Sequence, residues 1–128
     1  MKNEKFTIIL PLPSKVLSPN CAIGSIGGRF AKAAAAKRQR RLACEAILQA
    51  GVTTIPWNRC SVVPRLYHST NRKRDTDNAM ASLKSAYDGI VDAGVVPDDT
   101  PDHMRRMEPE FFVDKHHQRL ELEIERST

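Results

Sequence analysis

The segment over residues 118–125 constrains the fold more than any other part of the sequence. Within it three apolar residues alternate with three glutamates, in the order Leu120, Glu121, Leu122, Glu123, Ile124, Glu125. Successive side chains of a β-strand point to opposite faces, so one face of this strand is apolar and the other is charged. This alternation is typical of a sheet with one face packed on a core and the other in contact with water.

The remaining elements follow from turn signals and periodicity. Residues 5–10, 59–68 and 106–114 are expected to be strands. Two helices are expected. One covers residues 30–50, is rich in alanine and ends at Gly51; the other covers residues 78–93 and carries apolar side chains at spacings of three and four. The order β-α-β-α-β-β predicts a small single α+β domain over residues 1–128, with two helices packed on a mostly antiparallel or mixed sheet.

Composition fits such a domain and excludes several classes of protein. Hydrophobic residues make up 41% of the 128 residues and charged residues 27%, which suffices for a packed core and argues against disorder. No apolar run reaches the roughly 18 residues of a membrane span, and the opening residues lack the apolar segment of a signal peptide. The three cysteines are an odd number without a CxxC pattern, as expected in a reducing cytoplasm.

Charge is distributed unevenly along the chain. Residues 1–74 carry fourteen Lys and Arg against two Glu, a net charge of +12, whereas residues 75–128 carry six Lys and Arg against thirteen Asp and Glu, a net charge of −7. This asymmetry indicates a polyanionic partner such as nucleic acid, although the halves could also neutralise one another in the fold. Arg38, Arg40 and Arg41 lie on the first predicted helix, where they either bind phosphates or form an ordinary solvated face.

Residues 72–78, with the sequence RKRDTDN, place cations beside paired carboxylates where a strand gives way to a helix. In extended backbone alternate side chains point the same way, so Asp75 and Asp77 can converge. Converging carboxylates repel unless a cation relieves them, and oxygen-only ligands select a hard ion such as Mg²⁺ or Mn²⁺. A third carboxylate would come from Asp98 or Asp99 if that loop folds back. The alternative is structural. Asp and Asn at the start of a helix often only cap it, and Asp98 and Asp99 could form an ordinary turn.

Lys84 is the cation nearest to these acids on the second predicted helix. It lies seven residues after Asp77, which on an ideal helix leaves the two side chains about 20° apart. Lys84 could therefore steady a phosphate, or it could simply pair with Asp88 at the i,i+4 spacing. The chain has no Walker loop, GxSxG or zinc-finger spacing, so no nucleotide cofactor is expected.

Four segments together resemble the RusA family of crossover-junction endodeoxyribonucleases, the Holliday-junction resolvases often carried by phages and prophages. They are ILPLPSKVLSPN near the start, RKRDTDNAMASLKSAYDGIVDAG, the following VVPDD, and RLELEIE near the end. The opening segment departs from the family's compact Pro-Pro-Ser-x-Asn. In the family pattern the lysine follows the second aspartate by four residues, where this chain has Ala81, and Lys84 comes three residues later.

The resemblance implies a Mg²⁺-dependent homodimeric nuclease, with Mn²⁺ as a substitute ion, that resolves four-way DNA junctions in recombination and repair. The family's metal-binding aspartates fall on Asp75, Asp77 and Asp99, and its functional lysine falls on Lys84. On this basis the nearby DNA phosphates would be bound by Arg72, Lys73 and Arg74. Further phosphate contacts along the DNA would be made by Arg38, Arg40 and Arg41. We expect a cytoplasmic protein that associates with nucleoid or phage DNA.

Two other functions remain open at this point. The chain could be a non-catalytic DNA-binding module whose acids only cap helices. It could also be a metal nuclease that acts on flap or RNA substrates.

Overall fold

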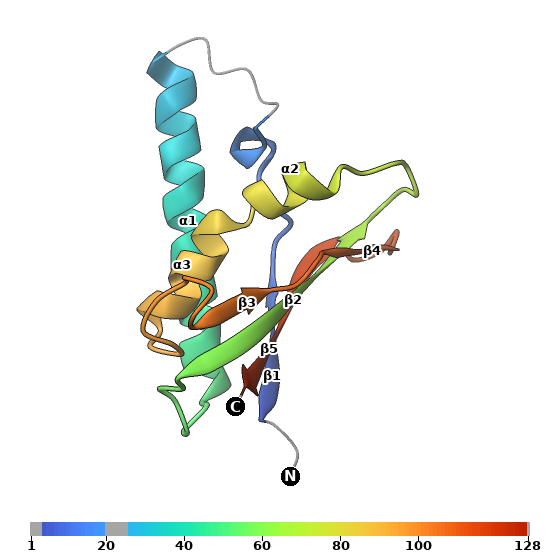
Figure 1. The fold of residues 1–128 in the computed structure, drawn as a ribbon. Coiled ribbons are helices and arrows are strands. Elements are labelled where there is room, and N and C mark those ends of the chain that lie inside the picture. Colours follow the sequence, from blue (N-terminus) through green and yellow to red (C-terminus); the bar gives the residue numbers. More distant parts are fainter. Residues whose placement is uncertain (1–3, 20–25, 128) are drawn as a thin grey trace.

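The computed structural model describes residues 4–19 and 26–127 (Figure 1). Its elements, in chain order, are β1 (Lys5–Leu10), the 3₁₀ turn η1 (Lys15–Leu17), α1 (Ile26–Ala50), β2 (Arg59–His68), α2 (Thr76–Ala81), α3 (Lys84–Asp92), β3 (Met104–Arg106), β4 (Glu110–Val113) and β5 (Arg119–Ser127). The domain is small, single and of the α+β class, as the sequence predicts.

The five strands form one mixed sheet. Its order is β1-β5-β2-β3, and β4 also pairs with β2 beyond β3. β5 runs antiparallel to both β1 and β2, whereas β3 and β4 run parallel to β2. β2 therefore connects the antiparallel half of the sheet to an edge made of two short parallel strands.

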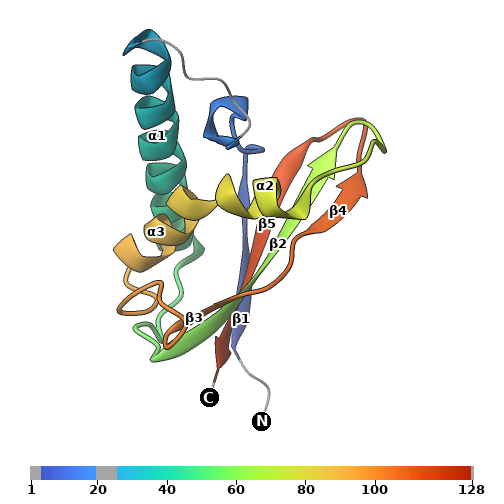
Figure 2. The ribbon, with the colours of Figure 1, turned by 45° about the horizontal axis from the view of Figure 1, so that its top comes forward.

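The helices cover one face of this sheet (Figures 1 and 2). Leu120, Leu122 and Ile124 are fully buried beneath them, while the alternating glutamates of β5 lie half-buried on the other face. The alternation over residues 118–125 thus predicts the covered face correctly. Tyr87 and Ile90 of α3 complete the core from the helical side.

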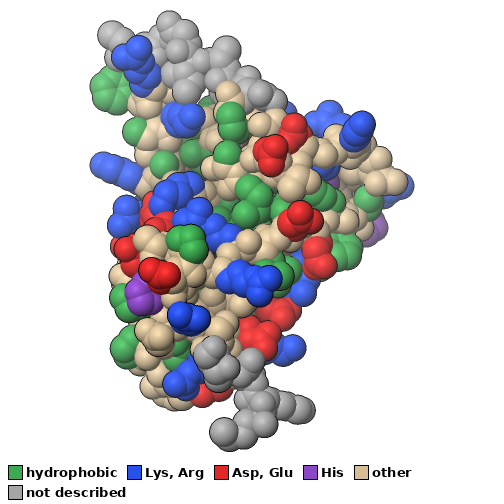
Figure 3. Space-filling model, in the orientation of Figure 1, with side chains coloured by type: hydrophobic (Ala, Val, Ile, Leu, Met, Phe, Trp, Pro, Cys, Tyr) green, Lys and Arg blue, Asp and Glu red, His purple; other side chains and the backbone are tan. Residues whose placement is uncertain are grey.

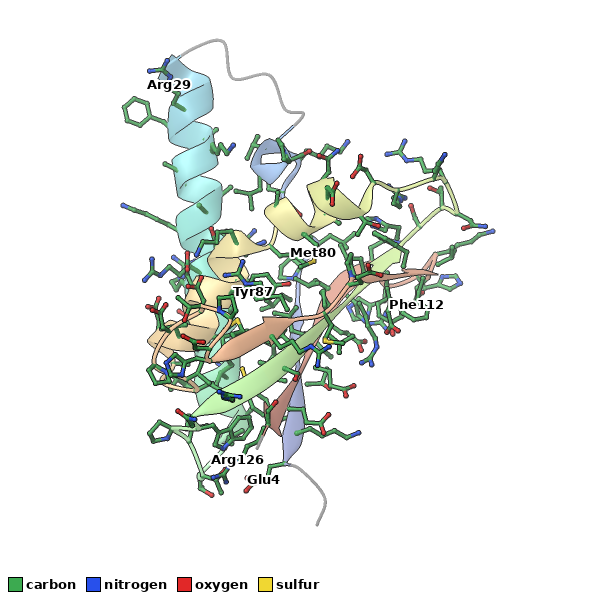
Figure 4. All side chains as sticks on the ribbon, in the orientation of Figure 1. Glu4, Arg29, Met80, Tyr87, Phe112 and Arg126 are labelled. Atoms are coloured by element: carbon green, nitrogen blue, oxygen red, sulfur yellow. The ribbon has the colours of Figure 1, made fainter. Side chains whose placement is uncertain are left out.

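α1 and α3 cross in close contact. At Gly89 an added Cβ would lie 2.7 Å from the Cβ of Ala43 and closer still to the carbonyl oxygen of Arg40, so only glycine lets the helices approach this far. The N-terminal half of α1 continues beyond this crossing, with Arg29 at its far end (Figure 4). Phe30 is 71% exposed there.

The prediction of one helix over residues 78–93 is wrong in one respect, because the structure divides it into α2 and α3. The side chain of Gln39, buried on α1, bridges the division. Its Nε2 donates to the carbonyl of Ser82 at 3.1 Å, and its Oε1 accepts from the backbone N–H of Ala86 at 2.9 Å. A side chain from α1 thus supplies hydrogen bonds at the junction of the two helices.

The predicted strand over residues 106–114 is also divided. β3 and β4 are separated by residues 107–109, which include Pro109, a residue that has no N–H to donate to a ladder. Cys44 and Cys60 are free thiols, and Cys21 lies outside the described residues. None of the helices described is both long and apolar enough to cross a membrane.

Candidate nucleic-acid interface and acidic site

The loop between β2 and α2 carries the predicted cationic residues. Arg72 and Lys73 are exposed, and Arg74 is half-buried, with one guanidinium nitrogen 3.4 Å from both the carbonyl oxygen and the hydroxyl of Thr70. Burial lowers the pKa of His68 at the end of β2, and Arg74 lowers it further, which favours a neutral imidazole. We call residues 72–74 the basic loop.

An open cavity of about 950 Å³ lies against this loop. It is lined by the basic loop, by Asp75 and Asn78 at the start of α2, and by Lys15 of η1, with His68 and Phe111 among its other walls. The rings of His68 and Phe111 stack at 6.4 Å between centroids. Three of the predicted phosphate-binding residues and one predicted metal ligand therefore border a single cavity.

Asp75 is the N-cap of α2. Its backbone is extended, with φ −94° and ψ 119°, and its Oδ1 accepts from the backbone N–H of Asn78 at 3.1 Å. Thr76 and Asp77 are already helical, so the extended backbone on which the expected convergence of Asp75 and Asp77 depended is not present. Both carboxylates are exposed. The capping role is thus confirmed for Asp75.

Lys84 and Asp99 are in direct contact. Lys84 Nζ donates to a carboxylate oxygen of Asp99 and, at 2.8 Å, to Oδ1 of Asp88. Arg106 donates to the same oxygen of Asp99 at 2.9 Å, and its guanidinium lies 4.8 Å from the ring centre of Tyr87. The loop after α3 lies against Lys84, and the predicted i,i+4 pairing of Lys84 with Asp88 forms.

These contacts shift two pKa values in opposite directions. The hydrogen bond from Lys84 is the main cause that lowers the pKa of Asp99, with Arg106 acting in the same direction. The hydrogen bond to Asp88, followed by the one to Asp99, raises the pKa of Lys84. Both groups are therefore held in their charged forms at neutral pH.

The expected alignment of Lys84 with Asp77 assumed one continuous helix, which the structure divides into α2 and α3. With α2 and α3 separate, Lys84 is the first residue of α3 and turns to the loop that carries Asp99. Figure 3, which views this side of the molecule, shows basic and acidic side chains interleaved over α2, α3 and the adjoining loops.

The three predicted metal ligands are not brought together. Asp75 lines the cavity beside the basic loop, whereas Asp99 lines a separate groove of about 780 Å³. Within residues 4–19 and 26–127, no group of three His, Cys, Asp or Glu side chains is placed to hold a metal ion. The oxygen donors suit Mg²⁺ by chemistry, and in this arrangement Asp99 contacts the cations Lys84 and Arg106.

The predicted cations of α1 differ from one another. Arg40 makes two hydrogen bonds with Asp92, at 2.5 and 2.8 Å, and Arg41 lies 3.6 Å from Glu45. Arg38 makes no ion pair with the described residues and lines a small cavity of about 150 Å³ against the 11–17 segment. Arg38 is therefore the one of the three whose charge is least neutralised within the described fold.

Sequence reasoning missed Arg106 and Gln39. Arg106 was detectable in principle, since it belongs to an Arg-Arg pair that follows the acidic loop by only a few residues. Gln39 has no sequence signal, because its partners lie 43 and 47 residues away along the chain.

Comparison with protein-family models and with curated proteins found no match to this chain.

Proposed function

We propose that this chain is a structure-selective DNA endonuclease that requires Mg²⁺ and resolves four-way junctions as a homodimer, as its resemblance to the RusA family implies. A junction has two equivalent strands to cut, and a twofold dimer supplies two equivalent sites. Such a protein would act in the cytoplasm on nucleoid or phage DNA.

One observation supports this proposal above the others: the basic loop and Asp75 border the same open cavity of about 950 Å³. Cations on the rim of such a cavity attract backbone phosphates, and the affinity should fall steeply with salt. A carboxylate beside bound phosphate gains nothing electrostatically unless a cation lies between them, so the position of Asp75 favours chemistry as well as binding.

The roles of the chain's own residues follow from their contacts. Arg72 and Lys73 are exposed and would bind phosphates, while Lys84 is held protonated beside Asp99 and would stabilise charge on the phosphate that is cut. Mg²⁺, when bound, would activate water and neutralise developing charge. Because the three aspartates are separate in this arrangement, the proposal requires Asp99 to give up Lys84 and Arg106 when substrate and ion bind.

A specific observation favours a second candidate, a DNA-binding module without catalysis. Asp75 is already used as a helix cap and Asp99 is already neutralised by two cations. On this alternative the carboxylates contribute only to folding, and the basic loop alone carries the function.

Asp75→Asn separates the two candidates. Asn caps a helix about as well as Asp, so the hydrogen bond to Asn78 is kept while the negative charge is lost. The matched control is Asp102→Asn, which removes a charge from an exposed residue outside both cavities. Binding and cutting should be measured with Mg²⁺ or Mn²⁺ on junction, flap, duplex and RNA substrates.

For a nuclease, the wild type and the control cut the junction, while Asp75→Asn binds it and cuts at least about a hundredfold more slowly. If the wild type binds junctions but cuts none of the substrates, the binding module is the correct function. Cutting of flap or RNA in preference to junctions would assign a different substrate on the same scaffold. Unchanged cutting by Asp75→Asn would remove this residue from the catalytic site.

A further inference from the structure

A second cationic surface lies at the opposite end of β2 from the basic loop. The groove of about 780 Å³ wraps around β3, one of the two strands at the edge of the sheet, and its walls include Arg59, Ser61, Asp99, Arg105, Arg106 and Ser127. We call it the arginine groove. None of these residues except Asp99 belongs to the predicted site.

Strand register places four of these side chains on one face. Ser61 is the partner of Arg105 in the β2–β3 ladder, and Arg59 is the partner of Ser127 in the β2–β5 ladder. Residues paired across a ladder share a face, as do alternate residues of one strand. The hydroxyls of Ser61 and Ser127 confirm this, since they lie 3.1 Å apart. Two guanidinium groups and two hydroxyls therefore converge on the face that the helices leave open.

The charge of the arginine groove is not balanced from within. Among its lining residues Asp99 is the one carboxylate, and it already contacts Lys84 and Arg106. Arg59 and Arg105 are exposed, and their side chains form no hydrogen bond or ion pair with any described residue. Glu125 faces Ser61 across the ladder but is not part of the lining. Arginines that lack a carboxylate partner, beside this hydrogen-bonded pair of hydroxyls, are suited to phosphate oxygens.

The wall of the groove is held in place by the loop before β3. The ring nitrogen Nδ1 of His103 lies 2.8 Å from the carbonyl oxygen of Asn58, and the backbone N–H of Cys60 donates to the carbonyl of His103 at 2.8 Å. The N-terminal end of β2 and the loop before β3 are thus tied together. The arginines extend from a fixed backbone, which lowers the entropy lost on binding.

We infer that the arginine groove binds the phosphodiester backbone of the nucleic acid whose other contacts are made by the basic loop. The two surfaces are separated by the length of β2, ten residues, or about 30 Å. One turn of B-form DNA is about 34 Å long, so a single duplex arm running along the β3–β4 edge would meet both surfaces. This inference rests on the proposed function, since it names where a second stretch of the same substrate is held.

The test is the salt dependence of binding to a four-way junction without divalent ions. The slope of log affinity against log salt is negative, and each lost phosphate contact should make it shallower by about 0.9 units. In a twofold dimer each substitution removes two contacts, so Arg59→Ala and Arg105→Ala should each make the slope shallower by about 1.8 units and the double variant by about 3.6 units. The affinity of the double variant should fall at least about tenfold. Lys115→Ala removes an exposed charge that lines neither surface and lies at the other end of β2 from the arginine groove, and it is the matched control for the arginine variants. Lys73→Ala reports on the basic loop.

The outcomes separate this inference from the proposed function. If Lys73→Ala makes the slope shallower but both arginine variants match Lys115→Ala, the arginine groove does not bind the substrate and the proposed function stands. If the wild type does not bind junctions or duplex, both fall. Replacement of both arginines by lysine should restore much of the slope, because a point charge suffices for a phosphate. Thermal unfolding of each variant should equal that of wild type.

Discussion

Gln39→Met is expected to destabilise the protein by about 3 kcal/mol. Methionine keeps the volume of the buried side chain but loses both hydrogen bonds at the junction of α2 and α3. Each bond contributes about 1 kcal/mol net, and the carbonyl of Ser82, left buried without its partner, costs roughly 1 kcal/mol more. The N–H of Ala86 keeps a second acceptor, the carbonyl of Leu83 at 3.0 Å. In a domain of this size, this loss of stability lowers the midpoint of thermal unfolding by about 12 °C.

The control is Gln118→Met. Gln118 also donates two hydrogen bonds, at 3.0 Å each, to the carbonyls of Asp114 and Lys115, but it is exposed. Water replaces these bonds, so the expected cost is below about 0.5 kcal/mol. Thermal unfolding should be followed by circular dichroism and by the fluorescence of Trp57, which is 1% exposed. If the two variants lose equal stability, burial of the Gln39 amide is not what holds the junction.

Three further predictions concern the helix crossing and the acidic site. Gly89→Ala should destabilise by about 1–3 kcal/mol in thermal unfolding, because the new methyl group overlaps α1; a gain in stability would show that the helices separate freely. Lys84→Met should raise the pKa of Asp99 towards its ordinary 3.8, measured by NMR titration of the carboxyl carbon. In wild type the stabilisation from this lowered pKa is present above pH 3.8 and is lost as the pH falls through the folded-state pKa of Asp99. The variant should therefore lose less stability on acidification than wild type. An acid unfolding transition identical to that of wild type would contradict this. Removal of divalent ions with a chelator should abolish junction cutting and leave binding intact, and cutting that persists would exclude the metal-dependent proposal.

Much of the fold follows from local patterns. The limits of β2 match the predicted strand, and the alternation of β5 identifies the buried face, because both depend on side-chain periodicity within one strand. α1 begins four residues before the predicted start and runs through Gly27 and Gly28. Two glycines cost a helix only about 1 kcal/mol each, which the rest of a helix this long outweighs.

The site was less predictable, because its geometry depends on tertiary contacts. The apolar spacing over Leu83 and Tyr87 continues smoothly across the junction of α2 and α3, so no local pattern shows that the helix is interrupted there. Lys84, the first residue of α3, contacts Asp99, which lies 15 residues further along the chain. Assembly of a metal site from two distant segments is a property of the whole fold and stays a prediction from the resemblance.

The short α2 has a consequence for motion. None of its six residues is buried and, among them, Met80 alone packs against the hydrophobic core, so local unfolding of α2 exposes little of that core. Asp75 and Asp77 thus belong to a segment of low local stability, whereas α3 is anchored by Tyr87 and Ile90. Amide hydrogens of α2 should exchange with solvent far faster than those of α3, and the spacing between the two aspartates and Asp99 is set by a segment that can rearrange while the rest of the domain remains folded.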